Sequence, residues 1–234
     1  ARQIISMQPR QGAFSEYLSI PERNLVKIPD GMSYAHAALT EPVATAMHAV
    51  LEGARLSRRA LADSRVLVLG GGAIGISVAL ILHSHGCRDI RLGETNALRR
   101  NTVSASGVCD VYDPINDPAP DADSWDIVID AVGGKATREA SSRAVKPGGV
   151  IVHIGLMDNK GGLDTRKLTL QEVTFIGCYT YTMVDIRTTV NALASGALGS
   201  LDWMELRPLS EGANAFADLA AGNSPAAKIV LVPN

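Results

Sequence analysis

The most regular hydrophobic pattern in the chain lies between residues 66 and 156, where short apolar runs alternate with segments of helical periodicity. Four apolar runs are typical of strands buried on both faces: VLVLG (66–70), IRLGE (90–94), WDIVIDAVG (125–133) and GVIVHIGL (149–156). The segments between them have helical spacing and cover residues 74–85, 96–106 and 135–145. This alternation predicts an α/β fold with a doubly wound parallel sheet that helices cover on both faces.

The regions on either side have other patterns. Residues 13–28 alternate apolar and polar positions around Pro21, which predicts short antiparallel strands with one face in water. Residues 34–56 have helical spacing, and Pro42 marks either a break between two helices or the first turn of the second. Beyond residue 156 we expect a strand at 173–182, helices at about 184–196 and 210–221, and a last strand in AKIVLVP.

A glycine-rich turn directly follows the first buried strand. It reads GGGAIG from Gly70 to Gly75, which satisfies the spacing G-x-G-x-x-G, and a helix is expected immediately after it. Gly70 permits a tight turn, Gly72 lets the backbone approach a pyrophosphate without a Cβ in the way, and Gly75 lets the helix pack closely on the sheet. The pyrophosphate would lie on the free N–H groups near Ala73 and Ile74.

An acidic residue ends the next strand. Glu94 follows Gly75 by about 20 residues, where its carboxylate would accept hydrogen bonds from the ribose hydroxyls of an adenosine. A carboxylate there would repel a 2′-phosphate, so the sequence favours NAD over NADP, although the nearby Arg99 slightly weakens this preference. Alternatives are a plain strand-to-helix turn and a methyltransferase, but the glycine spacing and the later VGG and PGGVIVHIG segments favour a dinucleotide. We therefore predict a Rossmann domain that binds NAD.

Composition narrows the choice of partners. The chain has 234 residues, of which 46% are hydrophobic, and a net charge of −2, so nothing indicates a basic surface for nucleic acid or a membrane. No apolar run reaches the roughly 18 residues of a membrane span, and no signal segment is evident. The three cysteines are widely spaced, which fits a reducing compartment. We expect a small-molecule substrate and a cytoplasmic location, without nucleic acid or membrane partners.

Several further segments resemble a known family. DSWDIVIDAVGG, KPGGVIVHIGL, EVTFIGCYTYT, AFADLAAG and AKIVLVP, together with GAFSEYLSIPERNLVKIPDGMSYAHAALTEPVATAMHAV, resemble the medium-chain dehydrogenase/reductases. The likeness is to their zinc-dependent alcohol and polyol branch, which includes sorbitol, galactitol-phosphate and threonine dehydrogenases that oxidise a secondary alcohol beside a zinc. It covers essentially the whole chain. It implies the end of a β-rich, GroES-like catalytic domain at 1–42, an NAD-binding Rossmann domain at 43–180 and a return segment to the catalytic domain at 181–234.

The resemblance also implies roles for individual residues. Glu41 matches a carboxylate that approaches or ligates the catalytic zinc, Thr45 a hydroxyl residue packed on the nicotinamide, and Lys228 a basic residue that can reach the pyrophosphate. The other implied residues line the cofactor: Ala131 and Val132 on the adenosine side, Ile154, Gly155 and Leu156 beside the nicotinamide carboxamide, and Cys178, Tyr179 and Thr180 at the end of that wall. Alternatively, Glu41 stabilises a helix N-terminus and Lys228 is a solvated strand residue.

The sequence departs from the family at the zinc. The cysteine and the histidine followed by glutamate that hold the family's catalytic zinc, and its four-cysteine structural lobe, have no match in this chain. A catalytic zinc needs about three protein ligands, which Glu41 alone cannot supply. His36 and His48 lie nearby in sequence, and we interpret both as helix-packing or surface residues. Because the chain opens at Ala1 without a methionine, we expect further sequence upstream, and zinc only in the intact protein.

Three functional hypotheses follow. The leading one is an NAD-dependent secondary-alcohol or polyol dehydrogenase, zinc-assisted in the intact protein. The second is a truncated module that binds NAD(H) without catalysis, and the third is a zinc-free reductase of the same superfamily. Residues 173–182 resemble the edge strand through which these enzymes pair their sheets, so we also expect a homodimer or homotetramer.

Overall fold

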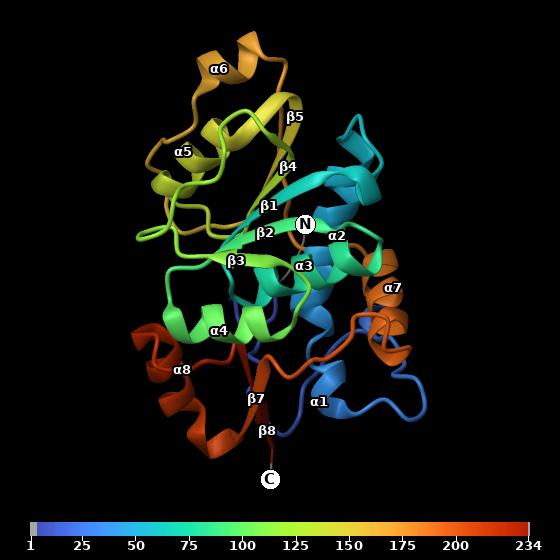
Figure 1. Cartoon of the computed structure of the whole chain (residues 1–234). Coiled ribbons are helices and arrows are strands. Elements are labelled where there is room, and N and C mark those ends of the chain that lie inside the picture. Colours follow the sequence, from blue (N-terminus) through green and yellow to red (C-terminus); the bar gives the residue numbers. More distant parts are fainter. Residues whose placement is uncertain (1–3, 234) are drawn as a thin grey trace.

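A six-stranded parallel sheet forms the centre of the computed structural model, which describes residues 4–233 (Figure 1). The strands run in the order β3-β2-β1-β4-β5-β6, and every neighbouring pair is parallel. They are β1 (Arg65–Leu69), β2 (Asp89–Gly93), β3 (Asp110–Tyr112), β4 (Trp125–Asp130), β5 (Val145–His153) and β6 (Thr174–Gly177). The order reverses between β1 and β4, which is where doubly wound sheets bind ligands. The predicted Rossmann sheet is confirmed.

Helices connect the strands and cover both faces of the sheet (Figure 1). They are α1 (Tyr34–Ala37), α2 (Thr40–Leu56), α3 (Ala73–Ser84), α4 (Ala97–Ala105), α5 (Lys135–Ala144), α6 (Thr165–Leu170), α7 (Met183–Ala194) and α8 (Gly212–Ala221). Short 3₁₀ turns are η1 (Glu22–Asn24), η2 (Leu61–Asp63) and η3 (Leu209–Glu211). Pro42 lies in the first turn of α2, where it costs no intrahelical hydrogen bond, so the second of the two readings of Pro42 is correct.

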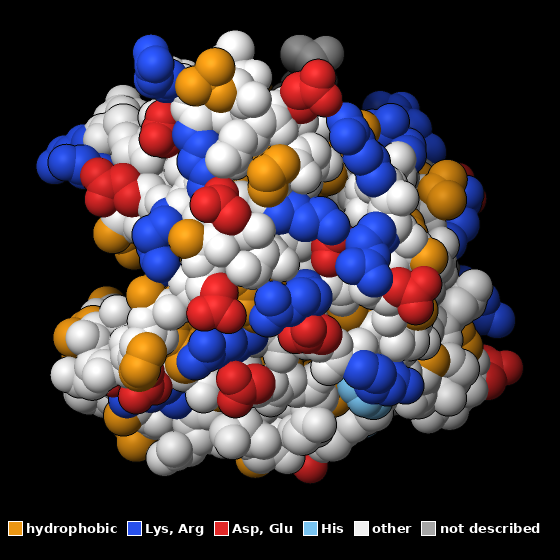
Figure 2. Space-filling model, turned by 45° about the horizontal axis from the view of Figure 1, so that its top comes forward, with side chains coloured by type: hydrophobic (Ala, Val, Ile, Leu, Met, Phe, Trp, Pro, Cys, Tyr) orange, Lys and Arg blue, Asp and Glu red, His pale blue; other side chains and the backbone are white. Residues whose placement is uncertain are grey.

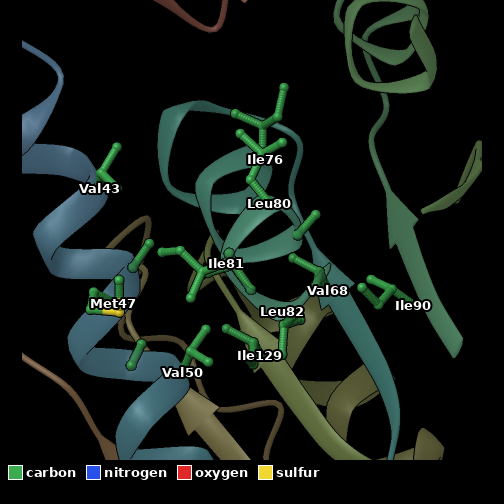
Figure 3. Packing of buried hydrophobic residues seen from close by; sticks show 14 of the residues in the cluster. Val43, Met47, Val50, Val68, Ile76, Leu80, Ile81, Leu82, Ile90 and Ile129 are labelled. Carbon is green, nitrogen blue, oxygen red and sulfur yellow. The ribbon is translucent and has the colours of Figure 1, made fainter. Parts of the chain in front are cut away.

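Successive strand residues face two separate cores because side chains alternate across a sheet. Val66 and Val68 of β1 belong to the larger core, which α2 and α3 cover, whereas Leu67 and Leu69 belong to a smaller core on the opposite face with residues of α5 and α6. Figure 3 shows the larger core, in which side chains of α2 point toward α3 and the sheet. The uninterrupted apolar runs of the sequence are explained by this burial on both faces.

Residues that follow the sheet form a separate small unit. β7 (Met204–Pro208) and β8 (Lys228–Val232) make a two-stranded parallel sheet that α8 connects. It is tied to α4, since Nδ2 of Asn96 donates to the carbonyl of Gly222 at 2.8 Å and Thr102 donates to Pro225 at 2.8 Å. The predicted domain boundaries remain predictions, and the outer ends of the first and third domains, residues 1–3 and 234, lie outside the described residues.

Several sequence predictions of local structure were wrong. Residues 13–28 form no strand and contain only η1, because a strand needs a hydrogen-bonded partner and none of the described chain lies alongside this segment as one. The strand predicted at 173–182 is limited to Thr174–Gly177. The sequence interpretation also missed β3, α6 and β7. β3 is only three residues long, and its apolar pattern is too short to be distinguished from a loop.

The surface agrees with the small net charge of the sequence. Figure 2 shows Lys and Arg side chains interspersed with Asp and Glu over the face in view. In the part of the chain that the structure describes, no helix is both long and apolar enough to cross a membrane.

Candidate cofactor-binding site

Most of the predicted site residues gather at one edge of the sheet, because the carboxyl ends of parallel strands meet there. They follow β1 (Gly70, Gly72, Ala73, Ile74, Gly75), β2 (Glu94, Arg99), β4 (Ala131, Val132), β5 (Ile154, Gly155, Leu156) and β6 (Cys178, Tyr179, Thr180). A hollow of about 410 Å³ between α5 and α6 lies instead near the amino ends of β4 and β5, lined by both acidic and basic residues. The carboxyl edge is therefore the candidate site.

Each of the three motif glycines is glycine for a different structural reason. Gly70 has φ +100°, a left-handed conformation, and a Cβ there would lie 2.6 Å from Cγ2 of Val132. A Cβ on Gly75 would overlap the carbonyl oxygen of Gly70, so this glycine permits close packing of α3 on the turn. Gly72 has an ordinary φ of −71°, and a Cβ there would meet no atom within 4 Å. Nothing in the fold therefore requires glycine at position 72, and its lack of a side chain leaves space above the turn.

The start of α3 faces this open space. Gly72 is the N-cap of the helix and provides no side-chain hydrogen bond, and the first turn has no acidic residue. The N–H groups of a helix's first turn have no intrahelical acceptor, and the helix dipole favours an anion there. Ala73 and Ile74 open the helix, as predicted, and Gly75 follows them in the same turn. This is a cradle that fits a phosphate group.

Glu94 is held by the same turn. The carboxylate is only 6% exposed, and it accepts the N–H of Gly71 at 2.8 Å through Oε2 and the N–H of Asn96 at 2.7 Å through Oε1. Nε of Arg99 lies 3.4 Å from Oε2. Burial raises the pKa of the Glu94 carboxyl, but the two N–H donors and the Arg99 charge outweigh burial, so the net shift is downward. Glu94 is therefore ionised at neutral pH.

The loops after β4 and β5 are joined to each other. The buried carboxylate of Asp130 accepts the N–H groups of Val132 and Gly133 at 3.0 and 2.8 Å, while its backbone carbonyl accepts those of Ile154 and Gly155. Nδ1 of His153 lies 3.1 Å from the same carboxylate. A Cβ on Gly155 would overlap the backbone after β4, so the two loops interlock.

The outer part of this wall is apolar and accessible. Leu156 is 83% exposed, and Tyr179 is also exposed, so neither side chain is committed to the protein core. Cys178 is buried, its N–H donates to the carbonyl of His153 at 2.9 Å, and burial raises the pKa of its thiol to about 11. Thr180 has φ +57°, which is unusual for a β-branched residue and is a form of strain that concentrates at functional sites.

The first turns of α2 reach the same edge. Glu41 is exposed at the start of the helix, and Thr45, one turn later, is buried and donates to the carbonyl of Glu41 at 3.3 Å. The Glu41 carboxylate interacts electrostatically with the hydroxyl of Tyr181, which places the start of α2 beside the segment after β6. Burial, and next the Glu41 charge, raise the pKa of Tyr181. The sequence interpretation missed Tyr181.

The described residues do not fit a zinc ion by themselves. Among residues 4–233, no three His, Cys, Asp or Glu side chains come together in a group that could hold a metal. Glu41 is therefore at most one ligand of the three that zinc requires. His36 is exposed, and His48 lies 3.1 Å from Oδ2 of Asp185 on α7, so the interpretation of both histidines as surface or helix-packing residues is confirmed.

Lys228 is the predicted residue that the structure separates from the main sheet. It opens β8 opposite Met204 of β7 and is partly exposed. The sequence interpretation also missed Gly71, Asn96 and Asp130. Asp130 could have been predicted from the sequence, since it is an acidic residue at the end of a buried strand, as Glu94 is.

Comparisons with known proteins agree with this arrangement. The family model described as "Zinc-binding dehydrogenase" matches residues 73–195, more than half of the chain, so the chain belongs to that family. It is 26% identical over 203 residues to sorbitol dehydrogenase 1 of Saccharomyces cerevisiae, covering 80% of this chain and 55% of the relative. It is 30% identical over 200 residues to L-galactonate-5-dehydrogenase of Escherichia coli, covering 81% and 56%.

Solved structures show the same fold. Acetophenone reductase from Geotrichum candidum in complex with NAD superposes with a TM-score of 0.80 at 23% identity, covering 92% of this chain and 61% of that one. The chain spans about half the length of the curated relatives it matches.

Proposed function

We propose that the chain is the cofactor-binding part of an NAD-dependent dehydrogenase that transfers hydride between a secondary alcohol or polyol and the nicotinamide. The observation that carries this proposal is the open space at Gly72 between the N-terminus of α3 and the ionised Glu94. The turn and the first N–H groups of α3 would hold the pyrophosphate. The named polyol and sugar-acid dehydrogenases among the relatives support the alcohol substrate.

Glu94 supports NAD over NADP. Two short hydrogen bonds, from the N–H groups of Gly71 and Asn96, fix the carboxylate of Glu94. Two long ones at 3.4 Å, from the Thr95 hydroxyl and from Nη2 of Arg99, complete its roughly four acceptor positions, and a ribose hydroxyl would replace one of these long bonds. Its negative charge would repel a 2′-phosphate. Arg99 lies 3.4 Å from the carboxylate and is paired with it, so its charge is largely compensated.

The remaining predicted residues would line other parts of the bound cofactor. Ala131 and Val132 would line the adenosine side, Ile154 to Leu156 would flank the carboxamide, and Cys178 to Thr180 would complete the wall, with Thr45 beneath the ring. Lys228 would approach the pyrophosphate from β8. When bound, NAD supplies the hydride acceptor. The residues of this chain orient it and exclude water from one side.

Zinc assistance is proposed for the intact protein only, where Glu41 would be one of the zinc ligands. Two alternatives are less favoured, since the matching family model describes a zinc-binding dehydrogenase: an NAD(H)-binding module without catalysis, and a zinc-free reductase of the same superfamily. Metal analysis of the intact protein distinguishes the zinc enzyme from the zinc-free one, since only the former would contain stoichiometric zinc.

We further propose that the protein forms a homodimer or homotetramer in the cytoplasm. β6 is the edge strand of the sheet, and Phe175 on it is 38% exposed, so this edge can pair with a second copy. All three cysteines are free, which fits a reducing compartment. Nucleic acid and membrane partners are not part of the proposal.

Titration of the chain with NADH, followed by cofactor fluorescence, tests the function. We expect saturable binding of NADH that is at least about tenfold tighter than that of NADPH, a difference of roughly 1.4 kcal/mol. Absence of saturation with both cofactors would contradict the proposal. Turnover of sorbitol or threonine by the intact protein then separates the enzyme from the binding module.

A further inference from the structure

The loop between β5 and α6 carries the proposed nicotinamide wall but has little structure of its own. Residues 154–164 contain neither helix nor strand, yet they must hold Ile154, Gly155 and Leu156 in a fixed position. Their geometry therefore depends on contacts with neighbouring segments. In the first half of this loop, the N–H of Met157 donates to the backbone carbonyl of Val132 at 3.1 Å, and the N–H of Asp158 donates to that of Gly133 at 3.1 Å.

One side chain from α5 holds both loops. Arg138 is only 8% exposed, and Nη1 donates to the carbonyl of Gly133 at 2.8 Å and to that of Asp158 at 3.0 Å. Nη2 donates to Oδ1 of Asp158 at 2.5 Å, and Nε donates to the carbonyl of Gly161. We call Arg138, Gly133, Asp158 and Gly161 the arginine latch.

The partners of Arg138 indicate what it does. They belong to the loop after β4 and the loop after β5, and none of these hydrogen bonds goes to a strand of the sheet. A guanidinium presents its donors in a rigid fork, so it can fix several acceptors in one geometry. The carboxylate of Asp158 also accepts the N–H of Lys160 at 3.0 Å. The latch therefore sets loop shape more directly than it supports the core.

The arginine latch fixes the backbone of the loop but leaves the side chains of Leu156 and Met157 free to contact a ligand. Leu156 and Met157 are both strongly exposed, although their backbone is pinned on either side by Gly155 and Asp158. A rigid backbone that presents exposed apolar side chains is suited to contact a planar ligand. Without the latch, the same side chains would sample many positions, and ordering them would oppose binding.

We propose that Arg138 is a positioning residue that, together with Asp158, fixes the nicotinamide wall; the inference rests on the proposed NAD site. Most of its hydrogen bonds go to the loop after β5, which would flank the nicotinamide, and none goes to the glycine turn at residues 70–75, which would hold the pyrophosphate. NADH and ADP-ribose separate these two parts of the site, since ADP-ribose lacks the nicotinamide.

The test compares Arg138→Gln, Arg138→Lys and Asp158→Asn with Arg143→Gln as the matched control. Arg143 is on the same helix but donates to the carbonyl of Pro120, away from the latch. We expect Arg138→Gln to weaken NADH binding about tenfold while ADP-ribose affinity changes less than about twofold. Asp158→Asn should weaken NADH about threefold, and Arg138→Lys should lie between Gln and wild type.

Hydrogen–deuterium exchange provides a readout that needs no cofactor. In Arg138→Gln the amides of Met157 and Asp158 should exchange about tenfold faster, whereas amides of β1 and α3 should be unchanged. Arg143→Gln should change neither readout. Equal weakening of NADH and ADP-ribose, no weakening of either, or unchanged exchange would overturn the inference. If the wild-type chain binds neither ligand, the proposed function fails, while exchange still reports whether the latch holds the loop.

Discussion

The backbone N–H of Gly71 donates to Oε2 of Glu94 at 2.8 Å, so the glycine turn holds the carboxylate that ends the neighbouring strand. A Cβ on Gly71 would lie 2.9 Å from Cβ of Glu94, which links the two positions sterically as well. The turn and the acidic residue are therefore joined into one unit by a hydrogen bond and by close packing. Its two parts come from β1 and β2, which pair directly in the sheet.

Glu94→Gln should change cofactor preference. The amide keeps an acceptor for one of the backbone N–H groups but removes the negative charge and leaves Arg99 without its partner. We expect NADH binding to weaken about fivefold and NADPH binding to strengthen, with both measured by fluorescence titration. Asp89→Asn is the control, since Asp89 is an exposed acid at the other end of β2. An unchanged NADH to NADPH ratio would remove Glu94 from the cofactor site.

Gly75→Ala should destabilise the fold. The added methyl group would overlap the carbonyl oxygen of Gly70, and backbone cannot move aside as a flexible side chain can. We expect a loss of about 1–3 kcal/mol in the free energy of unfolding, measured by urea denaturation. Gly107→Ala is a comparison with open space around its Cβ but φ +67°, so it reports conformational strain without overlap. Full stability of Gly75→Ala would show that α3 does not pack as described.

Gly72→Val should weaken NADH binding while it leaves the stability of the fold largely intact. The φ of Gly72 is accessible to any residue and a Cβ there meets no atom within 4 Å, although valine is a poorer N-cap than glycine, so we expect the free energy of unfolding to fall by no more than about 1 kcal/mol. The side chain would instead fill the space where a pyrophosphate approaches, and NADH binding should weaken at least about tenfold. Normal NADH affinity in a stable Gly72→Val variant would place the cofactor elsewhere.

The cysteines should be unreactive in the folded chain. Burial raises the thiol pKa to about 11 for Cys87 and Cys178 and to about 12 for Cys109, against an ordinary value of 9.0. At pH 8 we expect labelling by a thiol reagent about a hundredfold slower than in urea. Rapid labelling of Cys178 in native protein would show that the wall after β6 opens.

The same shifts define a pH dependence of stability. Since each folded-state pKa lies above 9.0, the folded chain retains these protons while the unfolded chain loses them. The contribution is fully present below about pH 9 and is lost as the pH rises toward 11 and 12. Urea midpoints measured from pH 7 to pH 11 should fall in the upper part of this range. Alanine at Cys87, which removes one of the titrating groups, should reduce the fall.

The βαβ unit could be predicted from sequence because its signals are local. A buried strand, three glycines and an acidic strand end all lie between residues 65 and 94, so the geometry follows from nearby residues. The failure at 13–28 has the opposite cause. The alternating pattern at 13–28 indicates which side chains prefer water. A strand also needs a second strand to form hydrogen bonds with, and the described chain places none beside this segment.

The arginine latch could not be predicted for a similar reason. Arg138 and Asp158 carry no motif, and their hydrogen bonds join segments that only the folded sheet brings together. Lys228 shows the limit of resemblance, since its place on a last strand follows from the local pattern, whereas its role at the pyrophosphate comes only from the family likeness. Contacts between residues far apart in the sequence can be identified only from the structure.

Because α2 packs closely on the sheet, a shift at one end of this helix would also move its other end. Gly53 lies against β5, where a Cβ would come within 3.1 Å of Cγ2 of Val152, while Glu41 stands about 18 Å further along the same stiff rod. A bulkier residue at position 53 would press on the side chains of Val152 and Ile127, and it can be accommodated if either these side chains or the helix shift. A tilt of a few degrees swings the far end by about 1 Å, and misplacement on that scale is enough to slow chemistry by two orders of magnitude. Packing of α2 on β5 would thus shift Glu41 and Thr45 without contacting either residue, and with them the nicotinamide site that we propose.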